Sequence, residues 1–77
     1  MTNPVVLVTS ATGRIGKELV ARLSASKKFT VRACYFSESK VDMLRELGAD
    51  QVVKFDLSDN STWPAALEGV SAIYSAS

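Results

Sequence analysis

The feature that most restricts the fold of this chain is an apolar strand that leads through a glycine-bearing turn into a helix. Residues 5–9 are Val-Val-Leu-Val-Thr, a continuous apolar run typical of a strand buried on both faces. The segment that follows places Gly13 and Gly16 where the turn enters the helix. Glycine lets a ligand approach the backbone closely, and the free N–H groups of a helix start attract anions. The beginning of the chain therefore predicts a phosphate-binding strand–turn–helix unit, the start of a nucleotide-binding βαβ unit.

Strands and helices alternate along the rest of the chain. The sequence predicts further strands over residues 29–36, 51–55 and 71–75. It predicts helices over residues 14–26, from Ser39 to Leu47, and from near Ser61 to Gly69. Short loops and right-handed crossovers then give a βαβαβαβ order with parallel strands arranged 3-2-1-4. We therefore expect an α/β fold, a partial Rossmann-like doubly wound sheet with the first two helices on one face and the third on the other.

Local signals mark the ends of the two short helices. Ser39 followed by Asp42 has the character of a capping box at the start of the second helix. Gly48 suits the position just after that helix, where a left-handed backbone conformation often ends a helix. Pro64 fits the third helix only in its first turn, so that helix is expected to begin near Ser61.

Composition excludes several classes of protein. The 77 residues allow one small domain, and the net charge of +1 gives no electrostatic footprint for nucleic acid. One cysteine and no histidine exclude an internal disulfide and a histidine-based triad, and they leave no basis for a structural zinc site. No apolar run reaches membrane-spanning length, and the start lacks the pattern of a signal peptide. We expect a cytoplasmic protein that binds neither nucleic acid nor membrane.

The predicted sheet is unevenly covered. The apolar sequences of its central strands predict burial on both faces, yet only one short helix would cover the face opposite the first two helices. The fourth strand would form an open edge. Such a sheet is completed by more chain or by another copy. We therefore interpret residues 1–77 as the N-terminal part of a larger domain, with self-association through the open edge, or a truncated chain without cofactor function, as alternatives.

The glycine spacing is close to that of a dinucleotide-binding loop. Ser10-x-x-Gly13-x-x-Gly16 matches a pattern of three glycines with serine in the first place. Ser10 is small enough for the turn and could donate to a phosphate, although it tolerates positive φ poorly. A tight turn without a ligand is the alternative interpretation of the two glycines.

Several segments together resemble the NmrA-like NAD(P)-binding proteins, a group of atypical short-chain dehydrogenases. The loop from Thr9 to Gly16 is similar to their T-G-A-T-G-x-x-G motif. The resemblance continues through four later segments: Val31-Arg32-Ala33, Leu47-Gly48-Ala49-Asp50, Asp56-Leu57 with Asp59, and Ala66-Leu67 with Gly69-Val70. It covers essentially the whole chain.

The resemblance implies a set of cofactor-binding residues. Gly13 and Gly16, with the backbone of Thr12, Arg14 and Ile15, would hold the pyrophosphate. Asp56 and Leu57 would flank the adenine, with the carboxylate accepting from its exocyclic amine. Ser75 and Ala76 would line the path to the nicotinamide ribose. The alternatives are a turn or capping carboxylate at Asp56 and an ordinary strand end at Ser75 and Ala76.

The choice between NADP(H) and NAD(H) depends on the residues after the second strand. About 20 residues past the last glycine, an acid favours NAD and an arginine favours NADP, but this chain has Phe36 there. Phe36 could stack on adenine or fill space. Arg14 and Lys40 are the nearest cations and Glu38 the only nearby acid, so NADP(H) is favoured over NAD(H), unless both cations are ordinary surface charges. Two hydroxyls that could donate to a phosphate lie beside Lys40: those of Ser37 and Ser39.

No catalytic residues are predicted in this segment. The Tyr-x-x-x-Lys pair of catalytic short-chain dehydrogenases is absent from the sequence. Cys34 has no histidine to activate it and is expected to be a buried structural thiol. Trp63 is expected to pack in the core beneath the sheet, with a role in binding a partner as the alternative.

The resemblance implies one of two functions. In the first, the chain is the cofactor half of an oxidoreductase of the quinone or small-carbonyl reductase type, whose catalytic groups lie beyond Ser77. In the second, it belongs to a non-catalytic regulator that senses the redox state of NAD(P) and acts through a protein partner. Whether the protein is an enzyme stays open at this point.

Overall fold

One parallel sheet organises the protein. The computed structural model describes residues 3–9, 11, 13–56 and 58–75. Its strands are β1 (Val5–Thr9), β2 (Thr30–Tyr35), β3 (Gln51–Lys54) and β4 (Val70–Ser75). Its α-helices are α1 (Arg14–Ser26), α2 (Val41–Glu46) and α3 (Trp63–Leu67), and 3₁₀ turns η1 (Glu38–Lys40) and η2 (Asn60–Thr62) precede the last two. The strands lie in the order β3-β2-β1-β4 with parallel pairing throughout, which confirms the predicted topology.

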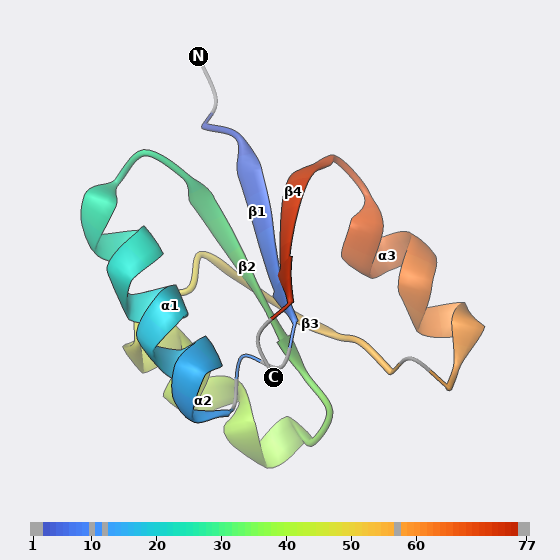
Figure 1. Ribbon diagram of the computed structural model, residues 1–77. Helices are drawn as coiled ribbons and strands as arrows, with labels where there is room; N and C mark the ends of the chain where they lie inside the picture. The colour runs from blue at the N-terminus through green and yellow to red at the C-terminus, as the bar shows by residue number, and fades with distance from the viewer. Residues whose placement is uncertain (1–2, 10, 12, 57, 76–77) are drawn as a thin grey trace.

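The helices form a layer on each side of the sheet. Figure 1 shows α1 and α2 on one face and α3 on the other. The larger core lies under α1 and α2, where Val6 and Val8 of β1 meet Val20 of α1 and Leu44 of α2. Side chains alternate between the faces of a strand, so Leu7, which is fully buried, points to the α3 side. The central strands β1 and β2 are therefore buried on both faces, as their apolar runs predict.

The outer strand β4 is much less covered. Ile73 is 53% exposed and Tyr74 is 40% exposed, although both belong to a strand paired with the buried β1. Alternation places these two side chains on opposite faces of the sheet. Both faces of β4 are thus partly exposed. This agrees with the prediction that the helices cover the sheet unevenly and leave the fourth strand at an open edge.

A buried arginine links the sheet to α3. Arg32 lies in the middle of β2 and is only 9% exposed. Its guanidinium donates from Nη1 to the carbonyl oxygens of Ala66 and Glu68, each at 2.7 Å, and from Nε to Gln51 Oε1 at 2.7 Å. The carbonyls at the end of a helix lack partners within the helix. Arg32 therefore satisfies the C-terminal end of α3 from beneath and holds this short helix on the sheet.

Two of the predicted helix-end signals are confirmed. Gly48 ends α2 with a φ of +109°, and Pro64 lies in the first turn of α3. The capping box predicted at Ser39 is wrong, because Ser39 lies inside η1, where its hydroxyl is 3.0 Å from the hydroxyl of Ser37. The 3₁₀ turn displaces the start of α2, and Lys40 occupies its N-cap without a side-chain bond.

Trp63 also differs from its expected place beneath the sheet. It is the first residue of α3 and is half-buried. Its ring centroid lies 6.4 Å from that of Phe55, the residue that follows β3. Trp63 thus packs beyond the end of a strand, because η2 brings the start of α3 back to the segment that leaves the sheet.

Replacing Gly48 by alanine should destabilise the fold by about 2–3 kcal/mol, because two costs add. The φ of +109° is unfavourable for alanine, and its methyl group would overlap the Ser24 hydroxyl. Gly69 is the matched control, since its φ is +71° but an added methyl would meet open space, so Gly69→Ala should cost only about 1 kcal/mol. Urea unfolding of both variants measures the difference, and equal losses would contradict the steric argument.

Replacing Arg32 by methionine should lower the free energy of unfolding by about 2–3 kcal/mol, because it removes the donor from the buried carbonyl of Ala66 and from the part-buried carbonyl of Glu68 at the end of α3. Arg22→Met is the matched control. Arg22 pairs with Glu18 at 2.6 Å on the exposed side of α1, and such surface pairs contribute about 0.5 kcal/mol or less. Similar denaturation midpoints for the two variants would show that Arg32 does not hold α3.

Candidate functional site

The topology selects one end of the sheet as the binding end. In open α/β sheets, ligands bind at the carboxyl ends of the strands where the strand order reverses. Here the chain moves outward from β1 through β2 to β3 and then returns to β4 on the other side of β1. The switch point therefore lies between β1 and β4. The segments that follow β1, β2 and β3 all emerge at this end.

The described residues at the start of α1 provide no side-chain cap. Gly13 is the N-cap of this 13-residue helix, with an extended backbone (φ −77°, ψ 170°), and its carbonyl accepts from Lys17 N at 2.9 Å. Glycine offers no capping side chain, and the first turn carries no acid. Gly16 is buried, whereas Arg14 and Ile15 are exposed. Ser10 and Thr12 lie outside the described residues.

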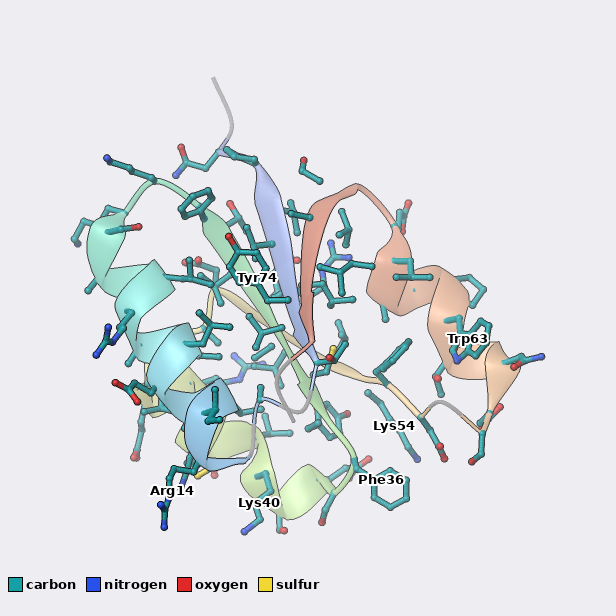
Figure 2. All side chains as sticks on the ribbon, in the orientation of Figure 1. Arg14, Phe36, Lys40, Lys54, Trp63 and Tyr74 are labelled. Atoms are coloured by element: carbon teal, nitrogen blue, oxygen red, sulfur yellow. The ribbon has the colours of Figure 1, made fainter. Side chains whose placement is uncertain are left out.

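The segment after β2 carries an exposed ring and a cation. Phe36 is 69% exposed, so its ring does not fill interior space. Lys40, in η1, is also exposed. Figure 2 shows Phe36 and Lys40 at the same end of the molecule as Arg14. The structure therefore brings these three predicted residues to the binding end, and the stacking role of Phe36 stays a prediction.

The segment after β3 folds into a tight polar turn at Asp56. Its Oδ1 accepts from Ser58 N at 2.9 Å and from Ser58 Oγ at 2.7 Å. The turn role that the sequence left open for Asp56 is therefore present, and the adenine role stays a prediction. Leu57 lies outside the described residues.

A second acid shapes the same turn. Hydrogen bonds from the hydroxyl and the backbone of Ser61, aided by the Lys54 cation, lower the pKa of Asp59 below its ordinary value. Its Oδ1 accepts from Ser61 N at 3.0 Å and so caps η2. Both carboxylates thus hold the backbone between β3 and α3.

The end of β4 lies beside the end of β1. Ser75 pairs with Thr9 in the sheet register, and the Thr9 hydroxyl is 3.4 Å from the Tyr74 carbonyl oxygen. The backbone of Ser75 is therefore next to the strand that leads into the glycine turn, and Ala76 lies outside the described residues. Sequence reasoning missed Thr62, whose hydroxyl accepts from Asp56 N at 3.0 Å. The available signal was a hydroxyl residue after an Asp-rich turn, a pattern typical of side-chain hydrogen bonds to the turn backbone.

Within the described part of the chain, no helix is long and apolar enough to cross a bilayer. Among the same residues, no group of three or more His, Cys, Asp or Glu side chains could hold a metal ion.

The parallel sheet, its strand order and its switch point define a Rossmann-like class of α/β protein. Comparison with protein families agrees. The chain belongs to the NAD(P)H-binding family, whose profile matches residues 10–77. No curated protein matches the sequence.

Solved structures with the same fold include an epimerase/dehydratase and a reductase. A putative NAD-dependent epimerase/dehydratase from Bacillus halodurans matches with a TM-score of 0.81 and 27% identity over 92% of this chain. Vestitone reductase from alfalfa matches with a TM-score of 0.74 and 25% identity over 92%. The structure of AtPrR2 with NADP+ and (+)pinoresinol has a TM-score of 0.74 and 22% identity over the whole chain, a likeness of fold. This chain covers 32%, 24% and 27% of those proteins, respectively.

The cysteine lies outside this site. Cys34 is buried in β2, and burial raises the pKa of its thiol from the ordinary 9.0 to about 12, an effect that the Arg32 cation partly offsets. A thiol with that pKa is almost fully protonated near neutral pH, and the thiol form is a poor nucleophile. The expectation of a buried thiol is confirmed.

The folded protein should therefore react very slowly with a thiol reagent such as DTNB at pH 8 and rapidly once urea unfolds it. Because the folded thiol keeps its proton at a pH where the unfolded thiol loses it, stability should fall as pH rises from about 9 towards about 12. Comparison with Cys34→Ala isolates this effect from lysine and tyrosine titration, since the variant should lose less stability over that range. Fast labelling of the native protein at pH 8 would contradict the assignment.

Proposed function

We propose that residues 1–77 bind a nicotinamide dinucleotide as the cofactor half of an NmrA-like oxidoreductase of the quinone or small-carbonyl reductase type. The observation that carries the proposal is the start of α1. There a glycine N-cap without a side chain stands at the switch point of a parallel sheet. Membership of the NAD(P)H-binding family gives this turn its expected ligand.

The pyrophosphate would lie against the start of α1. Gly13 and Gly16, with the backbone of Thr12, Arg14 and Ile15, would hold it. Gly13 is exposed and leaves room for a close approach, whereas the buried Gly16 lets the helix pack on the sheet. Ser10 would stand at the first position of the loop and donate to a phosphate oxygen.

The adenine would lie between the segments that follow β2 and β3. Phe36 offers an exposed ring for stacking, and Asp56 offers a carboxylate to the exocyclic amine, with Leu57 beside it. The nicotinamide ribose would lie near Ser75 and Ala76, where β4 meets β1. When bound, the reduced cofactor supplies a hydride, and the part of these residues is to hold and orient it.

Charge at the binding end favours NADP(H) over NAD(H). Arg14 and Lys40 are exposed there, and Ser37 and Ser39, which precede Lys40 in the chain, carry neighbouring hydroxyls that could donate to a 2′-phosphate. Glu38 is the acid in the same turn. The AtPrR2 structure holds NADP+ in the same fold, which is consistent with this choice.

The catalytic groups would come from a further part of a larger domain. This chain spans about a third or less of the length of each of the three solved proteins named above. The exposed faces of β4 and an adjoining open hollow of about 350 Å³ offer a surface on which more chain can pack. The hollow is lined by Leu67, Val70, Ser71, Ala72 and Ile73.

Titration calorimetry with NADPH, NADP+, NADH and NAD+, after circular dichroism has shown a folded chain, tests the proposal. We expect saturable binding that is tighter for NADPH than for NADH. Lys40→Ala should weaken NADPH binding about tenfold, the worth of about one charge-assisted hydrogen bond, and leave NADH binding unchanged.

Lys28→Ala is the matched control, because Lys28 is an exposed lysine between α1 and β2, at the opposite end of the sheet. It should leave all four affinities unchanged. A folded chain that binds no dinucleotide would refute the function. Equal losses for NADPH and NADH in Lys40→Ala would refute the role of Lys40.

A further inference from the structure

Two side chains hold the peptide groups of Asp56 from both sides. The Thr62 hydroxyl accepts from Asp56 N at 3.0 Å, and Trp63 Nε1 donates to the Asp56 carbonyl oxygen at 3.1 Å. Asp59 N donates to the same carbonyl at 3.0 Å. The backbone of Asp56 is therefore fixed by residues that follow it by up to seven positions.

The supports of Asp56 are themselves anchored. The Thr62 hydroxyl donates to the carbonyl oxygen of Asp59 at 2.8 Å, which ties it to the turn. The Trp63 ring packs on Phe55, the neighbour of Asp56, while its N–H reaches the Asp56 carbonyl. Since Arg32 holds the other end of α3, the position of Trp63 is set by the sheet itself.

The carboxylate of Asp56 is held in one orientation. Its Oδ1 accepts two hydrogen bonds from Ser58, one from the backbone and one from the hydroxyl. An ionised carboxylate has a second oxygen with its own lone pairs. With the backbone fixed by Thr62 and Trp63 and with Oδ1 fixed by Ser58, the direction of Oδ2 is also determined.

We propose that Thr62 and Trp63 are positioning residues for adenine recognition, which they set by holding Asp56 so that its carboxylate meets the exocyclic amine of the base. The inference rests on the proposed function. It assigns to two side chains outside the nucleotide loop the preference for adenine over a base that lacks the amine. A preformed acceptor gives more discrimination than a mobile one, because no ordering cost is added on binding.

The inference separates base selectivity from general affinity. The pyrophosphate would bind at the start of α1, away from the turn at Asp56, so a loosened Asp56 should leave that part of binding intact. Loss of either support should lower affinity for NADPH but not for its hypoxanthine analogue, in which a carbonyl replaces the amine. A merely structural role would lower both affinities together.

The experiment measures dissociation constants for NADPH and for reduced nicotinamide hypoxanthine dinucleotide phosphate. The wild-type chain should prefer NADPH about tenfold, the discrimination that one hydrogen bond to a charged acceptor provides. Thr62→Val and Trp63→Phe should reduce that preference to about twofold, with affinity for the hypoxanthine analogue changed less than twofold. Thr62→Ser, which keeps the hydroxyl, should retain the wild-type preference.

Two further variants serve as controls for the preference for NADPH. Asp56→Ala removes the acceptor and should abolish the preference. Thr30→Val is the matched control, because Thr30 begins β2 at the far end of the sheet and its loss of a hydroxyl should leave the preference unchanged. Trp63→Phe keeps an aromatic ring against Phe55, so it tests the N–H alone if the Thr62→Val chain fails to fold.

The outcomes are distinct. If Asp56→Ala abolishes the preference while Thr62→Val and Trp63→Phe keep it, the positioning role is refuted and the proposed function stands. Parallel loss of affinity for both nucleotides in these two variants would also refute that role. If the wild-type chain binds neither nucleotide, the proposed function itself fails and the inference falls with it.

Discussion

The hydrogen bonds of the Arg32 guanidinium hold α3, the helix that covers its face of the sheet. α3 has five residues, too few for a helix that is stable by itself. It is kept in place by a buried cation in β2 that donates to carbonyls at its C-terminal end. Because α3 begins with Trp63, which contacts Phe55 and Asp56, this one interaction also fixes the turn at the end of β3.

Much of the architecture could be predicted from the sequence because it follows from local patterns. The apolar run of β1, the helical spacing of α1 and the glycine after α2 each act within a few residues, and the structure places them as expected. Arg32 is different. Its charge inside an apolar strand makes sense only through the carbonyls of Ala66 and Glu68, which lie 34 and 36 residues away.

The candidate site also contains residues that could be predicted from the sequence and residues that could not. Gly13 and Gly16 could be found from the sequence because their spacing at a strand-to-helix junction is a local pattern. Phe36 could have been a filler or a platform, and only the folded chain shows its ring to be exposed. The support of Asp56 by Thr62 escaped prediction, since a side-chain bond to a backbone amide six residues earlier leaves no periodic signal.

The order of the strands explains why binding and reaction can be separate tasks in this fold. The turn after β1 and the segments after β2 and β3 lie at the same end of the sheet as the end of β4, so all four strands contribute to the end where a dinucleotide would lie. A partly exposed apolar surface lies on the other side of the switch, along β4. A ligand that binds only the folded state also stabilises it. The hydrogen bonds of Arg32 would therefore influence nucleotide affinity in two ways. They would set the shape of the turn at Asp56, and they would raise the fraction of the chain that is folded.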